Sequence, residues 1–194
     1  GYRLGYVIFP QHAVDLKAQF KKILATEYTA VSTPIQYAAI PGFEISHEMD
    51  NYFKITRNIH KIMGEYTYNT LTAIDGIKAT KPEATFYLLA DFNAYSPELH
   101  KAKITTSQKL SEALIVHPYH TAIVGGDSLV LERTDFSARI AYVDYDGAKV
   151  YDAYLAQTPK THSERTEFVQ NNAPKVVAGL TMIEKFFEAL KRDA

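Results

Sequence analysis

The sequence contains no cysteine. This absence excludes disulfide bonds, thiolate nucleophiles, iron–sulfur clusters and zinc sites built on sulfur. Any metal site would have to use histidine, aspartate or glutamate side chains. The absence of cysteine does not by itself indicate a cellular compartment.

The sequence also lacks an excess of positive charge and a long apolar run. Lysine and arginine together number 21, and aspartate and glutamate 22, so the net charge is -1. Binding of DNA or RNA is favoured by a basic excess, so no nucleic-acid partner is expected. No run approaches the ~18 consecutive apolar residues that span a bilayer, and no signal-peptide pattern is present at the N-terminus. We therefore expect a cytoplasmic protein with no membrane partner.

The chain does contain the apolar material that a core needs. Of its 194 residues, 46% are hydrophobic and 12% are aromatic. A chain of this length buries roughly 70% of the surface that its unfolded form exposes. The composition argues against disorder, and the length allows one or two domains.

Three elements are predicted in the first 45 residues. The run from Leu4 to Phe9 is apolar, β-branched and aromatic, which predicts a buried strand. Because a strand at the start of a chain needs neighbours, we expect natural sequence before Gly1. Thr33-Pro34-Ile35-Gln36 has the pattern of a capping box and predicts a short helix that ends at Pro41-Gly42. The helix predicted between these two elements has apolar residues at helical spacing: Leu16, Phe20, Ile23 and Leu24.

A long amphipathic helix is predicted from Ser46 to about Ala73. Such a helix suits a link between two parts of a larger protein as well as packing on one sheet. Its apolar positions are Tyr52, Ile55, Ile59, Ile62 and Tyr66.

The remaining sequence predicts an α/β layer with a small mixed or antiparallel sheet. A polar stretch at 147–172 has no clear period beyond a possible short helix at 148–155. The final helix follows Pro174, with five apolar residues facing inward: Val176, Leu180, Ile183, Phe187 and Leu190. Strands are predicted at 84–92, 121–125 and 137–145, and a further helix at 107–116.

Two short motifs have a functional and a structural interpretation. His117 and His120 are spaced to share a metal if a third ligand comes from elsewhere, but Pro118 interrupts any helix that would align them. Surface histidines before a strand are the favoured interpretation, so no metal ligand is predicted. Gly125-Gly126-Asp127-Ser128 lacks the spacing of a phosphate-binding loop and is interpreted as a turn. No G-x-S-x-G frame supports a hydrolase.

Arg139 differs from these motifs because it alternates with the apolar residues Ala141 and Val143, and with Tyr145, on one face of a predicted strand. A half-buried guanidinium needs an anion. From the spacing alone, a structural ion pair is favoured over bidentate capture of a substrate carboxylate, and both remain open. Arg3 by itself is an ordinary terminal arginine.

Four segments in this order resemble the fold-type I pyridoxal-phosphate aminotransferases of class I/II, the aspartate aminotransferase-like family. The resemblance covers nearly the whole chain and begins shortly after the position of that family's Schiff-base lysine, which this chain does not contain. The segments are Gly1-Tyr2-Arg3-Leu4-Gly5-Tyr6, Ser32-Thr33-Pro34-Ile35-Gln36-Tyr37-Ala38-Ala39, Lys81-Pro82-Glu83-Ala84-Thr85-Phe86-Tyr87 and Arg139-Ile140.

The resemblance implies a role for two arginines. Arg3 matches the arginine that contacts the phosphate of pyridoxal 5'-phosphate. Arg139 matches the arginine that clamps the substrate α-carboxylate, which changes the favoured interpretation of this residue from structural to functional. The family's Schiff-base lysine and the aspartate and aromatic residue that hold the cofactor ring have no positions here, so no catalytic residue is assigned.

The resemblance also implies how the chain is organised. It divides the chain into a remnant of the large cofactor-binding domain (1–45), a linking helix (46–75) and the small C-terminal domain on the substrate side (76–194). We expect the C-terminal portion of a transaminase that acts on amino acids and 2-oxo acids. The N-terminal half would be missing, the full-length enzyme would be a homodimer, and the isolated chain would be inactive.

Departures from the family pattern leave the specificity and the exact activity open. Gly125 stands where the family usually has proline, the Phe-Gly pair that follows is absent, and 147–172 resembles an insertion. The alternatives are a lyase or acyltransferase of the same fold type, or a non-catalytic binding or regulatory domain.

Overall fold

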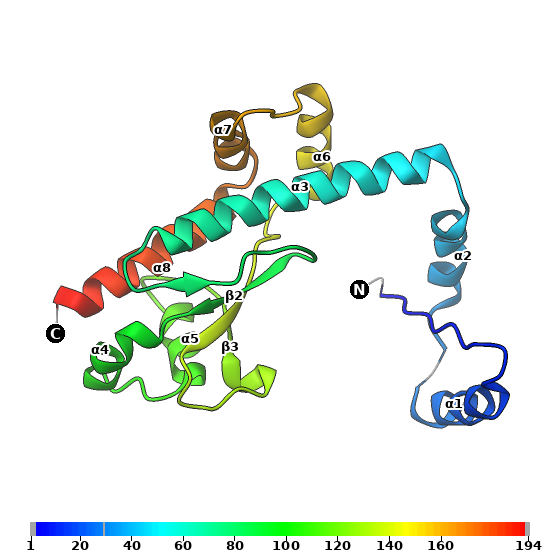
Figure 1. The fold of residues 1–194 in the computed structure, drawn as a ribbon, viewed down its shortest axis with the longest axis horizontal. Coiled ribbons are helices and arrows are strands. Elements are labelled where there is room, and N and C mark those ends of the chain that lie inside the picture. The colour runs from blue at the N-terminus through cyan, green and yellow to red at the C-terminus, as the bar shows by residue number, and fades with distance from the viewer. Residues whose placement is uncertain (1–2, 29, 193–194) are drawn as a thin grey trace. The chain divides into compact units, whose positions relative to one another are not determined.

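The computed structural model describes residues 3–28 and 30–192. The chain divides into two compact units between Phe53 and Lys54, inside the long helix α3 (His47–Thr72) (Figure 1). The domain boundaries expected from the family resemblance at 45 and 75 stay a prediction. No helix in the described part of the chain is both long and apolar enough to cross a membrane.

The first unit contains helices α1 (Val14–Glu27) and α2 (Thr33–Phe43). The strand predicted from Leu4 to Phe9 is wrong, because residues 3–10 form neither helix nor strand. A strand needs a backbone partner, and no described strand pairs with this segment. Gly1 and Tyr2, which begin the first family segment, lie outside the described residues.

The capping box predicted at Thr33 is also wrong. The N-cap of α2 is Ser32, and neither residue supplies a side-chain cap; instead the Gln36 side chain donates to the carbonyl of Val31 at 2.6 Å. The helix also continues through Pro41 to Phe43. Proline lacks an N–H donor and crowds the carbonyl four residues earlier, and here the helix ends two residues after it. The N-terminus predicted for α3 is confirmed, since the Ser46 hydroxyl accepts from the Met49 amide at 3.1 Å.

The second unit is built on a four-stranded antiparallel sheet with the order β1-β2-β4-β3. The small antiparallel sheet predicted from the sequence is thus confirmed. The strands are β1 (Lys78–Ala79), β2 (Tyr87–Asp91), β3 (Val124–Gly125) and β4 (Ser137–Ala141).

Three strands are shorter than predicted, and β1 was not predicted at all. Thr85 has a φ of 65°, so the extended backbone of β2 cannot begin before it. The Thr121 amide donates to the Leu114 carbonyl at the end of a helix, at 2.8 Å, which shortens β3. The backbone angle of Thr85 and the hydrogen bond of Thr121 set these strand limits, and the pattern of polar and apolar residues predicts neither.

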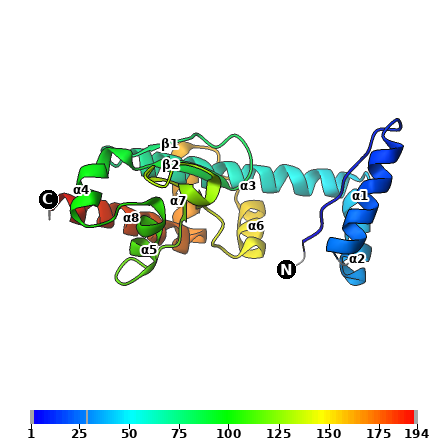
Figure 2. The same cartoon turned by 90° about the horizontal axis from the view of Figure 1, so that it is seen from below.

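Figures 1 and 2 show α3 and α8 next to this sheet. The helices predicted at 107–116, at 148–155 and after Pro174 are present, whereas α4 and α7 were not predicted. The bounds are α4 (Ser96–Lys101), α5 (Ser107–Ile115), α6 (Gly147–Ala156), α7 (His162–Asn172) and α8 (Pro174–Arg192), with short 3-10 turns η1 (Asn93–Tyr95) and η2 (Gly126–Leu129).

The hydrophobic core belongs to the second unit. One face of the sheet contributes Leu88, Ala90, Ala138 and Ile140, all buried. Phe187 of α8 stacks on Phe92 with ring centres 4.8 Å apart. Close packing also fixes α3, because a Cβ added at Gly64 would lie 2.9 Å from Pro82 and 3.0 Å from the Tyr142 hydroxyl.

Candidate functional site

Arg139 lies on β4, an interior strand of the sheet. Its backbone pairs with Leu89 of β2 on one side and with Val124 of β3 on the other. Hydrogen-bonded neighbours on both edges define the position of its Cα atom. The sequence predicted that Arg139 lies on a strand, and the backbone of β4 agrees with this prediction.

The side chain of Arg139 belongs to the face of the sheet that points away from the core. Its neighbours along the strand, Ala138 and Ile140, are buried on the core face with exposed fractions of 0% and 6%. Arg139 itself is half-buried. Because β4 ends at Ala141, Val143 and Tyr145 do not extend this face as the sequence predicted. The guanidinium is therefore supported by the sheet and still accessible.

Arg139 has no carboxylate partner among the residues that the structure describes. The ion pairs formed by these residues do not include it. Its Cζ atom instead lies 4.4 Å from the centre of the Tyr87 ring, a cation–π contact. The structural ion pair that the spacing favoured is thus not formed within the described part of the chain, and the in-plane N–H groups remain free for an anion.

Aromatic rings continue from Tyr87 toward the linking helix. The Phe86 ring centre is 4.2 Å from that of Tyr87 and 6.1 Å from that of His60 on α3. The Tyr145 hydroxyl lies 3.4 Å from Nδ1 of His60. Burial lowers the pKa of His60, which favours the neutral imidazole, and burial with the nearby Tyr142 raises the pKa of Tyr145. These groups therefore place no second positive charge beside Arg139 at neutral pH.

Arg3 lies in the first unit, in the irregular segment before α1. Its side chain is exposed, and it forms no ion pair or hydrogen bond with another described residue. A free, exposed guanidinium is suited to a phosphate group. Arg3 belongs to the first unit and Arg139 to the second.

Gly125 ends β3, and Gly126, Asp127 and Ser128 lie in the 3-10 turn η2, which agrees with the interpretation of the motif as a turn. Both glycines are required by close packing: a Cβ at Gly125 would lie 2.8 Å from the Ser107 carbonyl, and one at Gly126 2.9 Å from the Ser137 carbonyl. The Ser107 hydroxyl donates to Asp127 at 3.0 Å. Close packing against Ser107 of α5 and Ser137 of β4 therefore explains why the motif has two glycines.

The histidine pair has no third ligand within the described ranges. The ring centres of His117 and His120 are 5.7 Å apart. Among the described residues, no group of three histidine, aspartate or glutamate side chains is arranged to hold a metal ion.

A groove of about 740 Å³ lies in the second unit between residues 118–123, residues 140–144 and α8. Its lining includes Ile140, whose side chain is on the core face, and not Arg139. The lining also includes Ala141 of β4, so the groove reaches the strand that carries Arg139 without including that residue.

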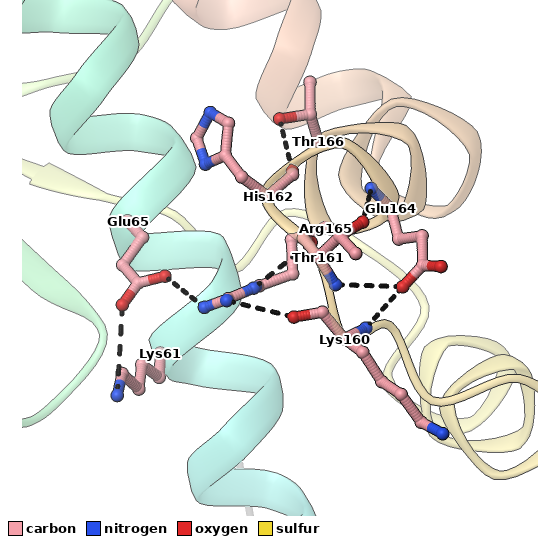
Figure 3. Close-up of polar contacts among 8 residues, drawn as sticks. All are labelled: Lys61, Glu65, Lys160, Thr161, His162, Glu164, Arg165 and Thr166. Carbon is pink, nitrogen blue, oxygen red and sulfur yellow. Dashed lines mark hydrogen bonds and ion pairs between the residues drawn. The ribbon is translucent and has the colours of Figure 1, made fainter.

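The sequence prediction missed the polar contacts that attach α7 to α3 (Figure 3). Arg165 of α7 donates to Glu65 of α3 at 3.1 Å and to the Lys160 carbonyl at 3.2 Å. Thr161 and Glu164 form a capping box, and backbone N–H donors lower the pKa of Glu164. The signal T-x-x-E was present in the sequence and would have located this helix.

Tyr87 was not singled out as a functional residue either. Its contact with Arg139 depends on the register between β2 and β4, in which Tyr87 pairs with Ala141. Register between strands that are distant in sequence has no local signal, so only the structure reveals this contact.

Comparison with known proteins agrees with the four segments found in the sequence. The model of the family "Aminotransferase class I and II" matches residues 1–150. A probable aspartate/prephenate aminotransferase of Aquifex aeolicus (strain VF5) is 29% identical over 119 residues, which are 59% of this chain and 27% of that protein. An aspartate aminotransferase of Pinus pinaster is 24% identical over 144 residues, or 73% of this chain and 28% of that protein.

The chain thus spans only about a quarter of the length of the curated relatives that it matches. The family model covers most of the chain, including the first unit, the long helix and the strand that carries Arg139. The small antiparallel sheet and its helices fit the fold that the resemblance predicted. The chain belongs to the class I and II aminotransferase family.

Proposed function

We propose that this chain is the substrate-side portion of a pyridoxal-phosphate-dependent aminotransferase that moves an amino group between an amino acid and a 2-oxo acid. The observation that carries the proposal is the half-buried Arg139 on an interior strand, with no carboxylate partner among the described residues. A planar guanidinium binds a planar carboxylate through two parallel hydrogen bonds. Such a clamp orients the Cα–H bond of the substrate for proton removal.

The residues present fit only part of the cofactor. Arg3 is exposed and unpaired within the described residues, which suits it to the phosphate group. When bound, pyridoxal phosphate supplies an electron sink for the bond broken at the substrate Cα. No residue of this chain is assigned to the cofactor ring or to proton transfer, so we expect the isolated chain to be inactive. In the longer enzyme we expect a homodimer.

The test is a pair of arginine variants in the native protein that contains this chain. Arg139→Ala removes one charge-assisted bidentate pair, so it should raise the KM for the amino acid about 10- to 100-fold with little change in cofactor affinity. Arg3→Ala should weaken cofactor binding and change the KM for the amino acid less. Steady-state kinetics and the absorbance of the bound cofactor measure the two effects.

Arg57→Ala is the matched control, because Arg57 is an exposed arginine on α3 that lies outside the proposed site. It should leave both quantities unchanged. Equal effects of the Arg139 and Arg3 variants on both quantities would contradict the role assignment. Product analysis with an amino donor and a 2-oxo acid distinguishes transamination from lyase or acyltransferase activity.

A further inference from the structure

The strongest unassigned contact in the second unit is the one between Tyr87 and Arg139. Arg139 pairs with Leu89, and Tyr87 pairs with Ala141, so Tyr87 and Arg139 are diagonal neighbours on the same face of β2 and β4. The Cζ atom of Arg139 lies 4.4 Å from the ring centre of Tyr87. At this distance the ring covers one side of the guanidinium.

A stacked guanidinium keeps its binding edge. The N–H groups of arginine point outward in the plane of the guanidinium, and a carboxylate binds them in that plane. The aromatic ring contacts the flat face instead. Arg139 therefore contacts Tyr87 through the flat face of its guanidinium and still presents two parallel N–H donors to a carboxylate.

A free arginine side chain samples many rotamers, and ordering it on binding reduces affinity. An aromatic ring that orders the side chain beforehand removes part of this cost. We infer that Tyr87 is a positioning residue for Arg139, whose ring holds the guanidinium in the orientation that binds the substrate α-carboxylate. This inference rests on the proposed function of Arg139.

Tyr87 is itself supported. The Phe86 ring lies 4.2 Å from it, centre to centre, and His60 lies 6.1 Å from Phe86. His60 belongs to α3, and its ring is next to the Tyr145 hydroxyl. The orientation of Arg139 is thus coupled through three rings to the long helix.

The ring rather than the hydroxyl of Tyr87 carries this role. The hydrogen bonds formed within the described residues do not include the Tyr87 hydroxyl, so it anchors neither Tyr87 nor Arg139. Phenylalanine keeps the aromatic face that contacts the guanidinium. Tyr87→Phe should therefore behave like the wild-type chain, whereas a residue without a π face should not.

The experiment uses the native protein that contains this chain, labelled with nitrogen-15 and measured by NMR. The Nε–Hε signal of Arg139, assigned with Arg139→Gln, reports both the ring-current shift from Tyr87 and the order of the side chain. Pyruvate is the carboxylate probe. The variants are Tyr87→Phe, Tyr87→Leu and Tyr87→Met, and the control is Tyr37→Leu, which removes an exposed tyrosine of the first unit.

We expect wild type, Tyr87→Phe and Tyr37→Leu to show the same shifted, ordered Arg139 signal. Tyr87→Leu and Tyr87→Met should lose the ring-current shift and increase the mobility of the side chain. Their apparent Kd for pyruvate should rise about three- to tenfold, the range of an ordinary cation–π contact. Two variants of different shape ensure that a folding defect in one does not decide the outcome.

The possible results separate this inference from the proposed function. If Arg139→Gln binds pyruvate as well as wild type, or if wild type binds none, the proposed carboxylate role fails and the inference about Tyr87 fails with it. If Arg139→Gln weakens binding while Tyr87→Leu and Tyr87→Met leave the Arg139 signal and the Kd unchanged, the inference about Tyr87 fails alone. Equal losses in Tyr87→Phe and Tyr87→Leu would assign the role to the hydroxyl and overturn it.

Discussion

The two units contain helices with the same kind of sequence pattern and opposite burial. In α8, Val176, Leu180 and Ile183 recur at helical spacing and are buried. In α1, Leu16 and Ile23 also recur at helical spacing, yet each is 55% exposed. No described residue of the first unit is buried. Helical periodicity thus predicts which face of a helix is apolar, whereas burial depends on what packs against that face.

The difference also separates two sources of helix stability. A helix in the second unit gains stability from the core, while one in the first unit depends on its own propensity and local contacts. Pairs of matched substitutions, one in each unit, test how far this contrast holds.

The largest expected effect comes from truncating a leucine in each unit. Leu71→Ala on α3 removes a fully buried side chain and should lower the free energy of unfolding of the second unit by about 2–5 kcal/mol. Leu16→Ala on α1 should change the stability of the first unit by no more than about 0.5 kcal/mol. Denaturant titration, followed by signals from each unit, measures both. A loss above about 2 kcal/mol for Leu16→Ala would show that α1 has a core of its own.

Glycine-to-alanine changes should have opposite signs in the two units. At Gly64 an added Cβ meets Pro82 at 2.9 Å, and overpacking should outweigh the gain in helix propensity, with a net loss of about 1 kcal/mol. At Gly42 an added Cβ meets nothing within 4 Å, so the substitution should stabilise α2 by about 0.5 kcal/mol.

Denaturant titration for Gly64→Ala and amide hydrogen exchange within α2 for Gly42→Ala measure these effects. Gly147→Ala is the control in the second unit, because Gly147 also has open space around its Cβ position. A stabilising Gly64→Ala would mean that α3 does not pack against Pro82 and Tyr142 as the structure shows.

The last pair of substitutions concerns helix caps. Thr161→Ala breaks the capping box of α7 and should cost about 1 kcal/mol. Thr33→Ala at the start of α2 should cost no more than a few tenths, because Thr33 makes no cap hydrogen bond. Amide exchange of the first turn of each helix measures both. Similar losses in the two variants would indicate that Thr33 does cap α2, as the sequence predicted.

The predictions made from the sequence succeed where the signal is local. The helical spacing of apolar residues located α1, α3, α5 and α8, and the order of the four segments was sufficient to identify the family. The predicted strand at Leu4 fails because a strand depends on a partner that the described chain does not provide. The helix α7 was missed because its polar sequence lacks an apolar stripe, although its capping box was readable.

For the candidate site too, the sequence predicted the features with a local signal and missed those that depend on strand pairing. The alternation of polar and apolar residues placed Arg139 on a strand, and the family resemblance supplied its expected role. The lack of a carboxylate partner within the described chain and the contact with Tyr87 were not predictable, because both depend on which strands pair and in which register.

The sequence by itself determined the helices α1, α3, α5 and α8, the family, and the two arginines that the family resemblance assigns to anions, since spacing and motif order are properties of the chain alone. The tertiary structure decided which apolar faces are buried, where each strand begins and ends, and that Arg139 stacks on a tyrosine instead of pairing with an acid of the described chain. These features depend on contacts between residues that are distant in the sequence, and no local pattern records them.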